Sequence, residues 1–302
     1  MEKLQLLEKR WYQDPGFPCS VLTIRRDKLL FPVHWHDELE MLYAPDCRIE
    51  VTIDGECLPL PQGAALIVNS GQLHSARLPE GQHGALQLLV FHPEIWLTGL
   101  QDLQLTGLVQ SILQGNLFLP TIWLPQDPAA TAFLASLTRL ICLGRQTFDG
   151  QTLAMRGELY LMLAGIVSRQ QILAVSDNRI SGRHHQAELI RRPIQYIHHH
   201  FQQNLKLTEL AALANLSESH FSRVFRQVLG QSVVTYINDY RIQQAARMLD
   251  GTDARITDIA LECGYPNLSY FVRCFRRQFD MTPSAYRRRL SPADRSVRSP
   301  AG

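Results

Sequence analysis

The sequence predicts a multidomain α+β protein, with an N-terminal β-barrel followed by helices and a C-terminal domain made only of helices. Two observations carry this prediction. Short apolar runs separated by turn signals fill the first third of the chain, as in a sandwich or small barrel. Helical periodicity dominates residues 186–290, and a segment about fifty residues long is repeated within them.

The barrel prediction rests on six short runs. Asp54 and Gly55 form a hairpin signal between two of them, because this pair favours the tight turns that join antiparallel strands. Many short strands at close spacing are typical of a barrel in which alternate side chains face inward. The runs expected to be strands are Val21–Arg25, Glu40–Ala44, Arg48–Ile53, Cys57–Leu60, Ala65–Val68 and Leu86–Phe91.

After residue 95 the periodicity becomes helical. Leu97–Leu117 and Ala129–Gly144 carry it, and Gly157–Leu173 carries it most strongly. The apolar stripe of that last segment would either pair two chains in a homodimer or pack against the barrel. The stripe consists of Leu159, Met162, Leu163, Ile166 and Val167. The domains expected are a barrel at 1–95, a helical dimerisation region at 96–175, a polar linker at 176–185, a helical domain at 186–290 and a disordered tail at 291–302.

The charge is distributed unevenly along the chain. The net charge is +2, but residues 186–302 contain 16 Lys and Arg against 10 Asp and Glu, and the preceding part is acidic. A basic C-terminal part indicates a polyanionic partner there. The sequence has no apolar window of membrane-spanning length, no secretory pattern and no disulfide spacing among its six cysteines, so a cytoplasmic protein with reduced thiols is expected.

The internal repeat has the pattern of two helix-turn-helix units. Leu207–Leu213 matches Ile256–Glu262 at an offset of 49 residues, and the following Phe and Arg positions match at an offset of 50. Thr208 and Thr257 are expected to cap the first helix of each unit. The expected turn residues are Asn215 and Gly264, and the expected caps of the second helices are Ser217 and Asn267.

The second helix of each unit is amphipathic. One face carries a Phe stripe, and the other carries Arg together with small or apolar residues. Such a face suits the major groove, because Arg pairs with both acceptors of a guanine edge and apolar groups contact the thymine methyl. The sequence therefore predicts binding of double-stranded DNA. The DNA-binding residues expected are Ser219, Ser222, Arg223, Arg226, Leu268, Ser269, Val272, Arg273, Arg276 and Arg277.

Residues 190–290 resemble the DNA-binding domain of the AraC-type transcriptional regulators. The segments that carry the resemblance are Ile256–Ala260, Cys263–Tyr265, Ser269–Phe271, Arg273–Phe279 and Pro283–Arg287. The resemblance implies a long helix, here Val233–Leu249, between the two units. This helix would place the second helix of each unit, called the reading helix below, on one face of DNA, with the two about one helical turn apart. Asp280 stands where the family usually has Gly, and because Asp tolerates the left-handed conformation, a strained but intact turn is expected.

Three histidines and one glutamate stand out in the barrel. His34, His36 and Glu40 share parity, so on a continuous strand they would face one way, and His74 follows later in the chain. Together they form a good ligand set for a first-row divalent metal. They also resemble the two motifs of the cupin barrel, which AraC-type regulators often carry at the N-terminus. The departures from those motifs are Lys28, Cys47, Asn69 and Leu78.

Three interpretations of these four residues stay open. The preferred one is a metal-free pocket whose His and Glu side chains hydrogen-bond a small polar effector such as a sugar, so that no cofactor is needed. The second is a divalent metal bound by the same residues. The third is structural, with the histidines satisfied in the core of the barrel.

The function expected is a sequence-specific transcription regulator, an activator that responds to a small metabolite and is not an enzyme. The resemblance implies a promoter site, RNA polymerase and a second copy of the chain as partners, and no membrane is involved. The first alternative is a metal-dependent cupin enzyme fused to a DNA-binding domain. The second is a DNA-binding dimer whose barrel senses nothing.

Overall fold

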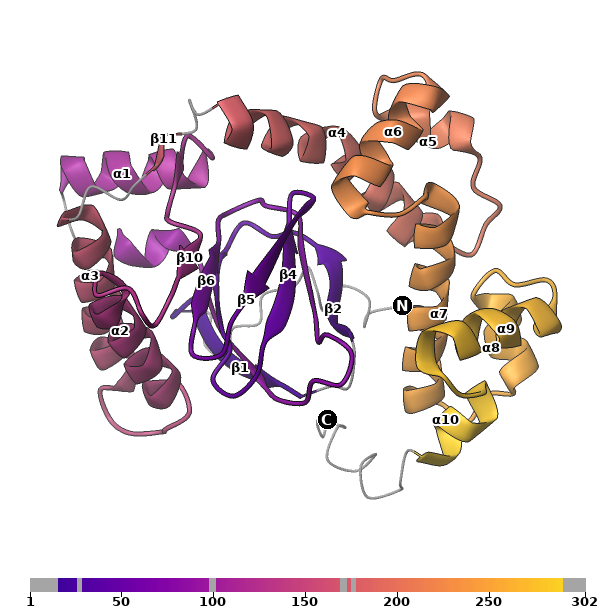
Figure 1. Ribbon diagram of the computed structural model, residues 1–302, viewed down its shortest axis with the longest axis horizontal. Helices are drawn as coiled ribbons and strands as arrows, with labels where there is room; N and C mark the ends of the chain where they lie inside the picture. The colour runs from indigo at the N-terminus through magenta and orange to yellow at the C-terminus, as the bar shows by residue number, and fades with distance from the viewer. Residues whose placement is uncertain (1–15, 26–28, 98–101, 169–172, 175–177, 290–302) are drawn as a thin grey trace. The chain divides into compact units, whose positions relative to one another are not determined.

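The computed structural model describes residues 16–25, 29–97, 102–168, 173–174 and 178–289 (Figure 1). Two compact units, Met1–Ala187 and Glu188–Gly302, are distinguished by their internal contacts. Each unit is described by itself below.

The first unit contains two antiparallel sheets in the middle of Figure 1. Five strands form one sheet in the order β1-β8-β3-β6-β10, and four form the other in the order β2-β7-β4-β5. A two-residue ladder joins β9 to β11. The strands are β1 (Cys19–Ile24), β2 (Leu29–His34), β3 (Leu39–Tyr43), β4 (Ile49–Ile53), β5 (Glu56–Leu60), β6 (Ala65–Val68), β7 (His74–Arg77), β8 (Leu86–Phe91), β9 (Leu117–Phe118), β10 (Ile122–Trp123) and β11 (Leu173–Ala174).

The core of this unit has two layers because strand side chains alternate between the faces of a sheet. On β3, Leu42 belongs to an apolar cluster that also contains Val51 and Ala76 of the other sheet, so this cluster fills the space between the sheets. Leu39 and Met41 point the other way, into a cluster with the helices that follow the barrel. The two sheets therefore enclose one core and the helices cover the outer face of one sheet.

The helices of the first unit are η2 (Pro93–Trp96), α1 (Leu103–Leu113), α2 (Ala130–Leu143) and α3 (Gln151–Ser168). Two expectations were wrong in detail. The barrel does not end at residue 95, because β10 pairs with β6 and extends the larger sheet. Of the helix expected at Leu97–Leu117, residues 98–101 lie outside the described residues, α1 covers Leu103–Leu113, and Leu117 begins β9. Helix α3 begins six residues before Gly157.

The apolar stripe of α3 is mostly part of the core. Leu159, Met162, Leu163 and Ile166 are buried in the cluster that covers the larger sheet, while Val167 is exposed. The stripe therefore cannot pair two chains, and of its two expected roles packing against the barrel is the observed one. The opposite face of α3 exposes Leu153 and Leu161 to solvent.

The polar segment expected as a linker at 176–185 is helical from residue 178 onward. Helix α4 (Asn178–His200) runs through it and continues past Pro193. In the first unit, the His184 ring lies 3.4 Å from the Asp54 carboxylate and edge-on to Phe118. The prediction failed because a polar, Gly-containing sequence is a weak indication against a helix when neighbouring groups give its side chains partners.

The second unit is all-helical, as predicted. Its long helix α7 buries Ile242, Ala245 and Leu249 in a cluster with the aromatic residues of the last helices. Its helices after α4 are α5 (Leu207–Leu213), α6 (Glu218–Leu229), α7 (Val233–Gly251), α8 (Ile256–Glu262), α9 (Leu268–Phe279) and α10 (Pro283–Arg289). The tail expected at 291–302 lies outside the described residues. Within the described part of the chain, no helix is long and apolar enough to cross a membrane.

Candidate nucleic-acid interface and barrel site

The second unit contains two helix-turn-helix units, α5–α6 and α8–α9. Asn215 and Gly264 adopt positive φ angles of 55° and 78° at the turns, as expected. A Cβ at residue 264 would lie 2.7 Å from the Gln202 carbonyl oxygen, so glycine is needed there for space as well as for conformation. The sharp turn sets the angle at which each reading helix leaves its partner.

Backbone caps define where each reading helix begins. The Ser217 hydroxyl accepts from the His220 N–H at 3.4 Å, and Asn267 Oδ1 accepts from the Tyr270 N–H at 3.0 Å, which confirms both predicted caps. Thr208 and Thr257 do not cap the first helices, because the N-cap positions are Lys206 and Arg255.

The ends of α6 and α9 match each other despite different residues. Gly230 ends α6 with φ 69°, and Asp280 ends α9 with φ 55°. The Asp280 N–H donates to the Arg276 carbonyl at 2.8 Å. The turn at Asp280 is therefore intact, as predicted, and its strain is that of a non-glycine residue in the left-handed region.

Each reading helix buries its predicted stripe. Phe225 and Phe275 are fully buried, and only Phe279 of the predicted stripe positions is partly buried. Most of the predicted DNA-binding positions are exposed on the opposite face, whereas Ser222 and Val272 are half-buried. The exposed members are Ser219, Arg223, Arg226, Leu268, Ser269, Arg273, Arg276 and Arg277.

Two arginines of α9 already have partners. The Arg273 guanidinium carbon lies 5.1 Å from the centre of the Tyr270 ring, whose hydroxyl accepts from Asn238 at 3.3 Å. Arg277 donates to Asp239 at 3.1 Å. The Tyr270 contact restricts the Arg273 side chain, so less entropy would be lost if its guanidinium bound a DNA base, as the sequence predicts. Arg277 must exchange an ion pair for any DNA contact, which weakens its case as a direct contact.

A groove of about 630 Å³ runs beside α6. It is lined by apolar residues of α5 and α7, including Val234, and by Arg223, Arg226 and Gln227 of α6. Gln227 lines this groove but is not among the predicted DNA-binding residues. It is exposed one turn after Arg223 and matches Arg277 in the repeat, so the offset of 50 residues could have identified it.

Arg226 and Arg276 are exposed further along their helices, where DNA phosphates are the expected partners. We expect Arg226→Gln and Arg276→Gln each to lower the slope of log affinity against log salt by about one unit, with sequence preference unchanged. The measurement is fluorescence anisotropy of labelled duplex DNA across a salt series. Arg48→Gln, at an exposed position of the first unit, is the control and should leave the slope unaltered. Equal slopes for all proteins would contradict these contacts.

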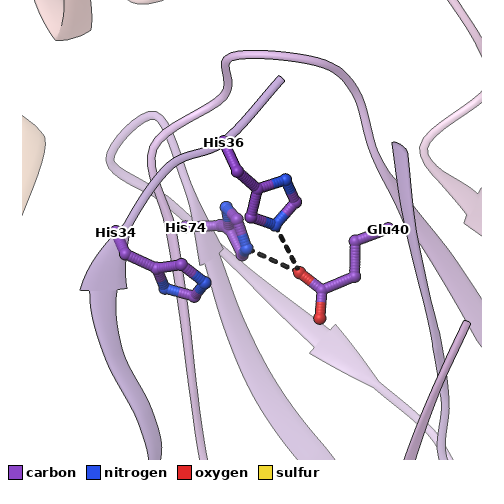
Figure 2. A group of neighbouring side chains, drawn as sticks. All are labelled: His34, His36, Glu40 and His74. Atoms are coloured by element: carbon purple, nitrogen blue, oxygen red, sulfur yellow. Dashed lines mark hydrogen bonds and ion pairs between the residues drawn. The ribbon is translucent and has the colours of Figure 1, made fainter. Parts of the chain in front are cut away.

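The four residues singled out in the barrel lie together (Figure 2). The ligand atoms of His34, His36, Glu40 and His74 all lie within 4.8 Å of one another. The parity argument behind this prediction was wrong. His34 ends β2 and Glu40 lies on β3, and these strands belong to different sheets. The residues converge because the chain crosses from one sheet to the other between them, and because Glu40 points into the space that the sheets enclose.

One carboxylate oxygen is the centre of the group. Glu40 Oε2 lies 2.7 Å from His74 Nε2 and 3.3 Å from His36 Nε2. His34 stacks at a tilt beside His74, with ring centres 4.2 Å apart. The His74 side chain is fully buried, that of Glu40 is 3% exposed and that of His36 is 10% exposed. The group is therefore largely shielded from water, where its mutual interactions are strong.

The second nitrogen of every ring faces a backbone carbonyl. His34 Nδ1 lies 2.9 Å from the Pro32 oxygen, His36 Nδ1 3.2 Å from the Glu38 oxygen and His74 Nδ1 2.8 Å from the Gln72 oxygen. A carbonyl only accepts, so each Nδ1 is assigned the hydrogen. The Nε2 atom of each ring then faces the other members of the group, and those of His36 and His74 donate to Glu40 Oε2.

The group also shifts the pKa values of its members. Burial alone would raise the pKa of Glu40, but hydrogen bonds and charge from His36 and His74 outweigh it and hold that pKa well below its usual range. Burial, with repulsion from the other two histidines, lowers the pKa of His34. Burial opposes the charged form of His36, yet Glu40 and Glu38 raise its pKa. A carboxylate anion and a neutral His34 therefore coexist near neutral pH.

Polar side chains hold the loop that contains Gln72, whose backbone carbonyl binds His74 Nδ1. Asp54 accepts from the Leu73 N–H at 3.0 Å and from Gln72 Nε2 at 3.2 Å. Asn69, which departs from the cupin motif, accepts from the Leu119 N–H at 2.7 Å and donates to the Leu119 oxygen at 3.2 Å. Here Asn69 ties the loop to the chain after α1, so its departure from the motif does not open the site.

Comparison with known proteins assigns families to both parts. Residues 20–163 match the model of an AraC-like ligand binding domain, and residues 210–289 match that of a helix-turn-helix domain. The regulatory protein SoxS of Salmonella typhimurium is 40% identical over 103 residues, which are 34% of this chain and 96% of SoxS. An uncharacterized HTH-type transcriptional regulator, YdeC of Bacillus subtilis, is 25% identical over 286 residues, 94% of this chain and 95% of YdeC.

Two solved structures to which this chain is similar cover about a third of it and nearly all of it. The C-terminal domain of the response regulator AraT from Geobacillus stearothermophilus is 35% identical with a TM-score of 0.32, covering 33% of this chain and 84% of that one. ToxT from Vibrio cholerae is 12% identical with a TM-score of 0.47, covering 90% of this chain and 99% of that one.

Proposed function

The chain belongs to the AraC-type transcriptional regulators, and from this premise we propose that it is an activator whose barrel controls its action at a promoter. It is a sequence-specific DNA-binding protein with a ligand-binding domain. The proposal adds that the effector binds at His34, His36, Glu40 and His74. One observation carries this addition: the four side chains converge inside the barrel, with their ring orientations fixed by backbone carbonyls.

The proposal treats the barrel as a sensor and not as an enzyme. The relatives are regulators, and both reading helices present an exposed Arg face that a DNA site requires. Activation implies contact with RNA polymerase once both reading helices are docked. A buried polar site in the other unit then supplies a means of control, because ligand bound there stabilises one conformation of the chain over others.

In vitro transcription tests the proposal. A promoter fragment selected by the protein itself is transcribed with purified RNA polymerase, with and without the chain. We expect more transcript with the wild type and none of this increase with Arg273→Ala. Glu40→Gln should still bind the fragment but lose the response to effector, because the charge at the centre of the site is removed. A drop in transcript would contradict activation, and an effector response that survives in Glu40→Gln would contradict the assigned site.

A homodimer is part of the proposal, with the outer face of α3 as its interface. Leu153 is 74% exposed and Leu161 66% exposed, one on each side of exposed Gly157, and such an apolar face is costly in water. We expect Leu161→Glu to raise the dimer dissociation constant roughly thirtyfold or more, since a central apolar contact contributes about 2 kcal/mol. Sedimentation velocity over a concentration series measures it.

The matched control for this prediction is Leu261→Glu. Leu261 is 62% exposed on α8 in the other unit, so the same substitution there should leave the dimer unchanged. A wild type that sediments as a monomer at every concentration would contradict the homodimer. An unchanged dissociation constant for Leu161→Glu would place the interface elsewhere.

A further inference from the structure

We propose that the ligand of the barrel site is a first-row divalent transition-metal ion held by His34, His36, Glu40 and His74, and that this ion forms all or part of the effector. This deepens the proposed function and rests on it. The sequence analysis preferred a metal-free pocket, and the geometry of the side chains favours the other interpretation for three reasons.

The first reason is the orientation of the rings. All three Nδ1 atoms lie 2.8–3.2 Å from backbone carbonyl oxygens, so all three Nε2 atoms are left to face the centre of the group. Histidines that bind metal almost always donate their other N–H to a carbonyl or carboxylate, which fixes the tautomer and the ring plane. Three rings held in this way around one point form a preorganised set of metal ligands.

The second reason is the number of acceptors. His36 and His74 hydrogen-bond Glu40 through Nε2, and once an ion displaces the hydrogens of these two contacts, three Nε2 lone pairs and the Glu40 carboxylate face one point. A sugar hydroxyl has a single hydrogen to donate, so it would engage only one of these four atoms. A cation satisfies all four at once.

The third reason is size and chemistry. Metal–ligand bonds of about 2.0–2.2 Å place neighbouring ligand atoms about 3–4 Å apart. The largest separation within the group is 4.8 Å, so small rotations of the side chains close it around an ion. Three imidazoles and one carboxylate suit Mn²⁺, Fe²⁺, Co²⁺, Ni²⁺ or Zn²⁺, whereas Mg²⁺ and Ca²⁺ prefer oxygen ligands alone.

Hydrogen bonds also hold the backbone that orients His74. The Gln72 carbonyl that anchors His74 lies in a loop held by Asp54 through two hydrogen bonds, to the Leu73 N–H and to the Gln72 side chain. Such support limits the movement of the His74 ring before the ion binds. Less entropy is then lost on binding, which raises the affinity for the ion.

The test is a titration of the full-length, untagged protein with Co²⁺, followed by visible absorption and by equilibrium dialysis. We expect one ion per chain, with absorption bands of a nitrogen- and oxygen-coordinated Co²⁺, and competition by Zn²⁺. Glu40→Gln and His34→Gln should each lower the affinity by at least about tenfold. His83→Ala, at an exposed histidine outside the group, is the control and should bind like the wild type.

Absence of stoichiometric Co²⁺ binding by the wild type would overturn the proposal, and this outcome does not depend on any variant folding. Stabilisation of the chelator-treated protein by one of a panel of neutral monosaccharides, with no shift from metal, would also overturn it and restore the metal-free pocket. DNase protection of a selected DNA fragment by the metal-free protein is measured in parallel. Its loss in every condition would instead count against the proposed regulator itself.

Discussion

Removing the two leading arginines together is expected to abolish recognition of the cognate DNA site. Arg223 and Arg273 are exposed at matching positions of α6 and α9, and each is expected to pair with a base edge at a cost of about 1–3 kcal/mol when lost. Because the two helices are expected to read separate parts of the site, the losses should add, so Arg223→Ala with Arg273→Ala should weaken binding roughly 30-fold to 20,000-fold.

The comparison with random-sequence DNA separates base contacts from general charge. Competition anisotropy measures the ratio of the affinities for cognate and random-sequence DNA. The double variant should lose far more affinity for the cognate site than for random-sequence DNA. The control for the change in net charge is Arg48→Gln or Arg25→Gln for a single variant and their combination for the double variant. Both residues are exposed in the other unit. An equal loss on the two DNAs would show that these arginines contact only phosphate.

Truncating the buried Phe of α9 is the second change with a large expected effect. Phe275 is fully buried, and its ring centre lies 4.7 Å from that of Phe279 and 5.4 Å from that of Tyr286. Phe275→Ala removes these contacts and leaves a cavity, which should cost about 3–5 kcal/mol of unfolding free energy. Such a loss is a large fraction of the stability of a unit of this size.

Hydrogen exchange with mass spectrometry on the full chain locates the effect. Amides of α7–α10 should lose protection in Phe275→Ala, whereas those of β3 and β6 should keep theirs, because the two units have separate cores. Val234→Ala is the matched control, since Val234 is 68% exposed. Unchanged protection in α7–α10 would contradict the packing described for Phe275.

The helical domain could be predicted almost completely from the sequence. Its helices have local signals: the Phe stripe of each reading helix, the caps Ser217 and Asn267, and the permissive turn residues Asn215 and Gly264. Each acts within one or two helical turns, so a linear pattern contains the information. The first helices are both capped two residues earlier than expected, because a cap depends on backbone geometry as well as on residue type.

The barrel was harder to predict because its structure depends on long-range pairing. β2 and β7 were not among the expected strands, and their pairing brings His34 opposite His74 across forty residues of sequence. The convergence of the four barrel residues was predicted correctly from a wrong premise, a single continuous strand. No local pattern shows that the chain changes sheets between His36 and Leu39. The first turns of α4 could not be predicted for the same reason.

The most direct test of the central claim is a DNase I footprint on DNA selected from a random library by the full-length chain. If α6 and α9 both read DNA, the selected sequences should contain two conserved blocks about one helical turn apart, and protection should cover both on one face of the duplex. Arg223→Ala should relax preference in one block and Arg273→Ala in the other. A single short block, or protection without sequence preference, would contradict a regulator that reads DNA through two helix-turn-helix units.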